Sequence, residues 1–319
     1  MQAIFLEPGK AGVPAESMDT EATSGFFWLD IERSESDWYQ DAAQWLDTHL
    51  HDRHLVDSLN GEQLPLYDGT DDYDLLVLRT LDPASPIAAP TTRPVALFLT
   101  SRAVISVRPQ GDKIFERTKE RLLAGQRKAP ATPVSLLALL TNQVVDQLLS
   151  RRETVSSLIT EWQDRLFDRE GSFDDWQPLA TLRSHLRRLE DISEDQLDAL
   201  SAWREQTNLT LDNTEQHRFE QLHSDLQRIF DHAAVMQADI DALVQIHYAA
   251  VGQRTNGTLR FLTVVSTVFL PLNLIAGIFG MNFSQLPFLQ SVTAPWVIVG
   301  LMGVLAAGLM FISRKRQWF

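Results

Sequence analysis

Residues 261–281 read FLTVVSTVFLPLNLIAGIFGM and contain no charged side chain. At 1.5 Å per residue this stretch would form about 30 Å of helix, the thickness of the hydrocarbon core of a bilayer. A second uncharged stretch, residues 294–312, follows a 12-residue link that also lacks charge. Because helices that are hydrophobic on all sides need lipid around them, the two stretches predict an antiparallel pair of transmembrane helices.

Basic residues flank the ends of these stretches that lie away from the link. Arg254 and Arg260 precede the first stretch, and residues 314–316 (RKR) follow the second. By the positive-inside rule this pattern predicts that both termini lie in the cytoplasm. The protein itself is expected in the inner (plasma) membrane, in contact with its lipid. Residues 1–7 (MQAIFLE) lack a basic segment followed by an apolar one, so no signal peptide is expected.

Charged and apolar residues are distributed unevenly along the chain, and the mean hydropathy of −0.13 does not reveal this. All 42 acidic side chains lie at or before Asp241, so residues 1–241 carry 42 acidic against 23 basic residues, a formal charge of −19. A surface of this sign repels nucleic acid and excludes it as a partner. The acids could concentrate cations or simply keep the domain soluble. Without cysteine, disulfides and thiolate metal sites are excluded.

The N-terminal third reads as a mixture of strands and helices. Short β-type runs are expected at residues 3–6, 25–31, 74–81, 95–100 and 103–107, with a helix near 37–50. After Pro130 helical periodicity takes over, with helices predicted over 133–168, 178–189 and from Ser193 onward. The fold class is therefore an α+β head followed by long helices.

A regular four-three spacing of apolar residues marks the helix before the membrane. No proline occurs from Leu179 to Leu270, so one helix could run from about Asn213 into the first membrane stretch. The spacing is typical of a coiled-coil seam, which predicts a stalk assembling with its own copies. Antiparallel packing on the chain's own helices is the alternative. The seam consists of Leu222, Leu226, Ile229, Ala233, Met236, Ile240, Leu243, His247 and Ala250.

The same spacing continues into the first membrane stretch, but there it selects small and polar residues. An asparagine amide in hydrocarbon costs several kcal/mol, so Asn273 needs a partner or a wet path. Bonding between neighbouring helices would satisfy a lone polar residue, whereas a whole stripe favours a pore with Leu259 and Leu270 as apolar constrictions. The predicted pore-lining residues are Asn256, Leu259, Thr263, Ser266, Leu270, Asn273 and Gly277, with Gly280 continuing the stripe.

The first membrane stretch ends in the tripeptide Gly280-Met281-Asn282, and here the sequence resembles the CorA family of divalent metal ion transporters. The run from Phe269 to Phe283 is similar to the family's pattern almost position by position, and the tail from Arg314 to Phe319 resembles its C-terminal end. Looser similarity in order and spacing covers most of the remaining chain, at residues 27–30, 54–59, 73–78 and 95–108.

This resemblance implies a homopentameric funnel with an α/β/α head, a long stalk helix and an axial pore that passes divalent metal ions. Gly280, Met281 and Asn282 would form the pore mouth, where Asn282 meets a hydrated ion, with Asn273 as a second metal contact. The implied organisation is an α/β domain at 1–130, a helical and stalk region at 131–257, a pore-lining helix at 258–282, an external loop at 283–293, a second membrane helix at 294–312 and a basic cytoplasmic tail at 313–319.

One departure from the family leaves the ion open. Magnesium-type members usually carry an acidic residue in the loop after the tripeptide, and residues 283–295 have none. Members like ZntB also tend to lack it. The expected cargo is therefore Mg²⁺, with Co²⁺, Ni²⁺ and Zn²⁺ as further candidates. A ZntB-like zinc transporter is one alternative, and a non-conducting membrane-anchored scaffold or regulator is another.

Two further clusters are candidate metal sites. His49, His51 and His54 could bind Zn²⁺ if they converge, although surface histidines at a helix end would give the same pattern. Asp191, Glu194, Asp195 and Asp198 could bind a regulatory divalent ion, and a solvated helix start would explain them equally well. No phosphate-cradling glycine loop or nucleophile constellation occurs, so neither an enzyme nor a cofactor is expected.

Overall fold

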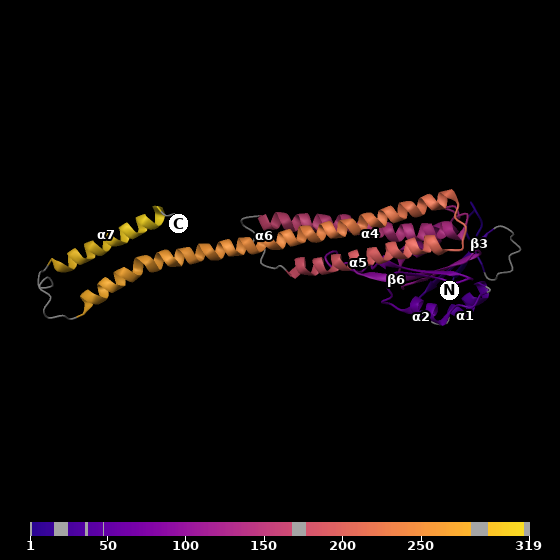
Figure 1. Ribbon diagram of the computed structural model, residues 1–319, viewed down its shortest axis with the longest axis horizontal. Coiled ribbons are helices and arrows are strands. Elements are labelled where there is room, and N and C mark those ends of the chain that lie inside the picture. Colours follow the sequence, from indigo (N-terminus) through magenta and orange to yellow (C-terminus); the bar gives the residue numbers. More distant parts are fainter. Residues whose placement is uncertain are drawn as a thin grey trace. The chain divides into compact units, whose positions relative to one another are not determined.

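The computed structural model describes residues 2–15, 25–35, 38–46, 48–167, 177–281 and 293–315. The chain separates into two compact units, Met1–Leu243 and Val244–Phe319. Helix α6 (Asn213–Gly280) contributes to both units, and helix α7 (Ala294–Lys315) belongs to the second (Figure 1).

A seven-stranded mixed sheet forms the centre of the first unit, with the order β2-β1-β3-β7-β6-β5-β4. Only the β3–β7 pair is parallel, and the other neighbours are antiparallel. The strands are β1 (Gln2–Leu6), β2 (Val13–Pro14), β3 (Phe26–Glu32), β4 (Leu66–Gly69), β5 (Asp74–Leu81), β6 (Thr92–Leu99) and β7 (Ala103–Arg108).

Helices cover both faces of this sheet, because its strands are apolar on both sides. Along β3, Trp28 packs into one core and its neighbour Leu29 into the other, as the two-residue period of a strand requires. Helices α1 (Trp38–Leu46) and α2 (Asp52–Leu59) lie on one face, and α3 (Lys113–Leu123), α4 (Pro133–Phe167), α5 (Gln177–Gln206) and α6 on the other (Figure 1). The expected α/β/α head is confirmed.

The five predicted strands are all present, and the predicted helix near 37–50 is α1. Strands β2 and β4 and helices α2 and α3 were not predicted from the sequence. It was wrong to begin a new helix at Ser193, since α5 runs unbroken from Gln177 to Gln206. The Ser193 hydroxyl is buried and donates to the Leu189 carbonyl at 2.7 Å, so this serine lies inside the helix rather than capping one.

The stalk seam packs within the chain itself as far as Leu243. Leu222, Leu226 and Ile229 belong to the core that α4 and α5 also line, and the later positions through Leu243 are buried too. Arg183 of α5 forms a 2.7 Å ion pair with Asp241 of α6, which joins the two helices further along. The prediction of an intersubunit seam is therefore wrong for residues 222–243, and the alternative of packing on the chain's own helices is right.

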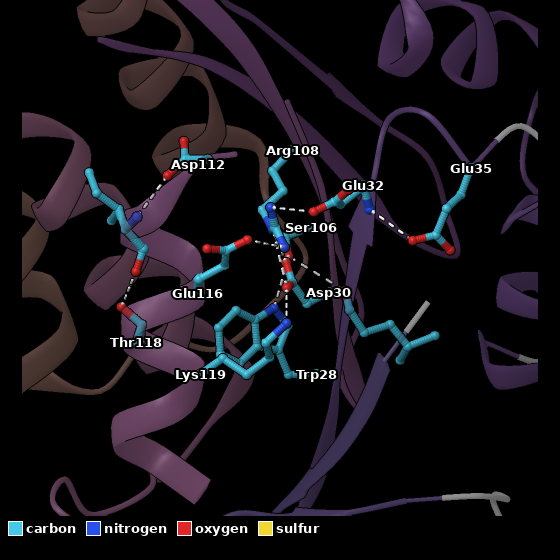
Figure 2. Close-up of polar contacts among 12 residues, drawn as sticks. Trp28, Asp30, Glu32, Glu35, Ser106, Arg108, Asp112, Glu116, Thr118 and Lys119 are labelled. Carbon is cyan, nitrogen blue, oxygen red and sulfur yellow. Dashed lines mark hydrogen bonds and ion pairs between the residues drawn. The ribbon is translucent and has the colours of Figure 1, made fainter. Parts of the chain in front are cut away.

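A buried ionic cluster fixes α3 to the sheet (Figure 2). The Asp30 side chain on β3 is fully buried and accepts from Arg108 Nε at 3.0 Å and Lys119 Nζ at 2.7 Å. Its Oδ1 also accepts from the Ser106 hydroxyl at 3.0 Å, and Trp28 Nε1 donates to that hydroxyl at 3.0 Å. Two cations and one hydroxyl thus compensate a carboxylate removed from water.

Arg108 also reaches acidic side chains nearer the surface. Its guanidinium lies 3.2 Å from Glu32 and 3.5 Å from Glu116. Burial lowers the pKa of Arg108, but the carboxylates of Asp30, Glu32 and Glu116 outweigh it, so that the pKa is raised overall. Arg108 therefore stays charged, and it links β7, β3 and α3.

Candidate functional site

The predicted pore-lining residues form a mostly polar stripe on the exposed side of α6 in the second unit. The stripe includes two leucines, Leu259, which is 54% exposed, and Leu270, which is 69% exposed. An apolar side chain on the surface of a single chain needs lipid or another subunit to cover it. All eight stripe residues are exposed: Asn256, Leu259, Thr263, Ser266, Leu270, Asn273, Gly277 and Gly280.

Part of the opposite side of the same helix is covered. Val264 and Val268 are only 2% and 8% exposed, and at about 100° per residue they lie across the helix from Asn273 and Ser266. In Val244–Phe319 the other described helix is α7, so we assign this cover to α7. Its partly or fully buried positions recur at helical spacing: Ile298, Met302, Leu305, Ala306, Leu309 and Ser313.

Polar groups on α6 differ in whether they already have a partner. The Thr263 hydroxyl donates to the Leu259 carbonyl at 2.7 Å, and the Thr267 hydroxyl donates to Thr263 at 2.7 Å. These protons are used inside the helix, while the oxygen lone pairs remain available to accept. The exposed Asn273 amide has no such bond in the described part of the chain. Asn256 and Ser266 of the stripe also have no such bond there, so these three groups have the most to gain from water or an ion.

The helix continues through Pro271, which lacks an N–H for the Thr267 carbonyl and so leaves that carbonyl without its usual backbone donor. The helix ends at Gly280, and the exposed Met281 follows with its N–H 3.4 Å from the Ile278 carbonyl. Asn282, the predicted ion contact at the mouth, lies outside the described residues. Its role stays a prediction.

The histidine cluster does not converge on a metal. His54 is buried, with Nδ1 2.8 Å from the Tyr73 hydroxyl and Nε2 3.1 Å from Asp68. Both ring nitrogens therefore already have partners, whereas His49 and His51 are exposed. Within the described residues no group of three or more histidine, aspartate or glutamate side chains could hold a metal ion.

The acidic cluster on α5 lies in mid-helix, so its explanation as a helix start is wrong. Burial, and then the nearby Asp191 and Asp198, raise the pKa of Asp195, as expected where like charges are crowded. The cluster forms no described metal site. It is a partly solvated acidic strip on the surface of the first unit.

Sequence reasoning did not single out three arginines that line one pocket in the first unit, Arg117, Arg121 and Arg127. They could have been found from the sequence, because three arginines within eleven residues are unusual in a region of formal charge −19. Asp30 was missed as well, because its partners Arg108 and Lys119 are more than 70 residues away along the chain.

An α/β/α unit whose last helix, α6, continues into an apolar segment and is followed by the apolar α7 is the architecture expected of an integral membrane protein. Both apolar helices are long enough to cross a bilayer, and only small fractions of them are buried in the chain.

Comparisons with known proteins identify the family. The profile described as "CorA-like Mg2+ transporter protein" matches residues 23–315. The cobalt/magnesium transport protein CorA of Thermotoga maritima is 24% identical over 84% of this chain and 77% of its own length. The zinc transport protein ZntB of Vibrio parahaemolyticus is 21% identical over 92% of this chain and 89% of its own.

The fold agrees with this assignment. The complete structure of the CorA magnesium transporter of Methanocaldococcus jannaschii superposes with a TM-score of 0.86 and 18% identity, covering 100% of this chain and 99% of that one. The chain therefore belongs to the CorA-like Mg²⁺ transporter family, whose members are transporters of divalent cations rather than enzymes.

Proposed function

We propose that this protein is a homopentameric channel that moves Mg²⁺ across the inner membrane through an axial pore lined by α6. Co²⁺, Ni²⁺ and Zn²⁺ pass with less preference, and both termini face the cytoplasm. The ion itself is the cargo, and no cofactor takes part. Surrounding α6 with α6 from other copies would bring the exposed stripes together around one path.

The observation that carries this proposal is the two-sided character of α6 in the second unit. Val264 and Val268 are covered within the chain, while the polar stripe across the helix is exposed. Hydrocarbon is a poor environment for Asn256, Ser266 and Asn273, because an unpaired amide or hydroxyl there costs several kcal/mol. A water-filled path between subunits satisfies these groups, and lipid does not.

The stripe also supplies what a gate needs. Leu259 and Leu270 alternate with polar residues, and rings of leucine around an axis would close a narrow pore by excluding water. Between them, Thr263 and Ser266 offer hydroxyl oxygens to a passing ion. Ions would thus move between polar rings separated by apolar constrictions.

Selection at the mouth falls to Gly280, Met281 and Asn282. Mg²⁺ releases its water reluctantly, so a ring of neutral amides can hold the hydrated ion without trapping it. Because residues 283–295 contain no carboxylate, little raises the local cation concentration, and capture at this ring is weak. Discrimination among divalent ions there is modest, and Asn273 makes any sharper choice deeper in the pore.

Zinc transport is the second candidate. The neutral loop at residues 283–295 and the similarity to ZntB of Vibrio parahaemolyticus favour it. A non-conducting scaffold is the third reading, and it rests on the same neutral loop together with the amide at position 273.

Flux into liposomes that contain only the full chain decides among the three. Mg²⁺ and Zn²⁺ uptake would be measured for the wild type, for Asn282→Ala and for Gln285→Ala, a matched loss of an amide outside the tripeptide. We expect Mg²⁺ to enter faster than Zn²⁺, Asn282→Ala to abolish uptake, and Gln285→Ala to keep it.

Each other result points elsewhere. Faster Zn²⁺ entry supports the ZntB-like candidate. Equal flux in all three proteins removes Asn282 from the mechanism. No flux of any divalent ion by the wild type supports the scaffold.

A further inference from the structure

A pocket of about 440 Å³ opens between α3 and α4 in the first unit. Three arginines line it, namely Arg117 and Arg121 of α3 and Arg127 from the segment that follows. Its volume falls within the range of small-molecule sites, which is about 300–1,000 Å³. The pocket lies wholly in Met1–Leu243, so it is independent of the ion path on α6.

All three arginines are exposed on the surface of the first unit. In the described part of the chain none of them forms a salt bridge with a carboxylate. Burial, and then repulsion from Arg121 and from Arg218 of α6, lower the pKa of Arg127. The pocket thus collects positive charge inside a region whose formal charge is −19.

The fold brings the backbone positions of the three arginines together. Lys119 points to Asp30 in the buried cluster and so fixes how α3 is rotated (Figure 2). Arg117 and Arg121 are four residues apart and therefore share one side of α3. After the helix, Gly125 adopts φ +66°, and the Arg127 N–H donates to the Arg121 carbonyl at 3.1 Å. This turn returns Arg127 toward Arg121.

We propose that this pocket binds a polyphosphate-bearing small molecule of the class of nucleoside di- and triphosphates. A guanidinium presents a planar fork of donors that matches phosphate oxygens in pairs, and arginine clusters are a recurring means of binding phosphate. Three such groups can serve more than one phosphate. A single inorganic phosphate would leave part of the cluster uncompensated.

The remaining lining suits the rest of such a molecule. Asn142 offers its amide oxygen and Gln147 its amide N–H groups, and Ile114 and Leu139 offer apolar contact. Asp146 is the one acidic side chain in the lining. In metal-free buffer its charge opposes an anion, so its removal should strengthen binding.

Binding to the full chain in detergent would be measured by equilibrium dialysis in metal-free buffer, with inorganic phosphate, pyrophosphate and ATP as separate ligands. We expect ATP and pyrophosphate to bind at least tenfold more tightly than inorganic phosphate. Arg121→Gln/Arg127→Gln should weaken ATP binding by about tenfold or more, since one hydrogen bond to a charged group contributes roughly that factor. Asp146→Asn should tighten it.

The matched control is Arg53→Gln/Arg187→Gln, which removes the same charge from exposed positions outside the pocket. It should bind ATP as the wild type does. An equal loss in the control would reduce the effect to general electrostatics and overturn the site. No saturable binding of any of the three ligands, or equal binding of inorganic phosphate and ATP, would overturn the proposal as well.

Discussion

The two parts of α6 carry the same four-three spacing and meet opposite environments. In the first unit Leu222, Leu226 and Ile240 are at most 2% exposed, whereas in the second Leu259 and Leu270 are more than half exposed. Apolar residues at this spacing indicate only that one side of a helix must be buried, and not what buries it. In the first unit the chain's own helices supply that cover. In the second it must come from lipid or from further copies.

This difference separates stability from transport. The first unit buries its apolar residues by itself and presents an acidic surface, so it has what an independently stable domain needs. The second unit exposes apolar and polar residues together on one helix, and these need lipid or further copies to cover them. Substitutions in the first unit should therefore lower stability, whereas substitutions in the second should impair transport.

The largest effect is expected from Ile240→Asp, which would bury a charge in the first unit. Ile240 is 0% exposed, and an unpaired carboxylate there should cost more than about 3 kcal/mol of the free energy of unfolding. Thermal unfolding of the purified protein would report it. Val235→Asp is the matched control, because Val235 lies on the same helix and is 55% exposed. If Ile240→Asp kept its stability and changed only the oligomer mass, the seam would instead pack between subunits.

A smaller loss is expected from Asp30→Asn. It would leave Arg108 and Lys119 beside a neutral group in the buried cluster, at a cost of about 3 kcal/mol, near the lower end for breaking a buried pair. Denaturant unfolding would measure it against Asp57→Asn, which removes a partly exposed pair with Arg53 worth about 0–1 kcal/mol. Similar losses for the two variants would mean that the cluster is not what holds α3.

The smallest effect concerns Asp112, whose carboxylate caps α3 by accepting from the Ile114 N–H at 2.9 Å. Burial is the main cause that raises the pKa of Asp112 above its usual value. A carboxyl with a raised pKa binds its proton more tightly in the folded state. Its contribution to stability therefore grows as the pH falls through the window between the unfolded pKa and the higher folded one.

Asp112→Asn keeps a side-chain oxygen for the cap and removes this titration. The melting temperature of the wild type minus that of Asp112→Asn should therefore increase as the pH is lowered from 7 to mildly acidic values. A difference in melting temperature that does not change with pH would show that the Asp112 carboxyl does not titrate differently in the two states.

The sequence predicted those parts of the fold that depend on local pattern. The membrane helices follow from uncharged length, and α6 begins at Asn213 as expected. Helix α3 was missed although its signal is local: Asp112 as cap, with Phe115 and Leu122 on one side. By contrast, the pairing of Asp30 with Arg108 follows from the β3–β7 register, in which Asp30 lies opposite Ser106, and no local pattern contains that register.

The candidate site shows the same limit. The stripe from Asn256 to Gly280 could be read from spacing, because it depends only on the period of one helix. Whether a side of a helix faces its own chain could not, as residues 222–243 demonstrate. The arginine pocket depends on the rotation of α3 and on the turn at Gly125, and both are set by contacts distant in sequence.

The central claim is that the stripe on α6 borders a water-filled path for divalent ions. The chain contains no cysteine, so single cysteines can be placed at Ser266, on the stripe, and at its off-stripe neighbour Val265. The measurement is Mg²⁺ uptake by liposomes before and after a positively charged methanethiosulfonate reagent. We predict that uptake through Ser266→Cys is blocked and uptake through Val265→Cys is not. Equal block at both positions, or none at Ser266→Cys when labelling is complete, would contradict the account.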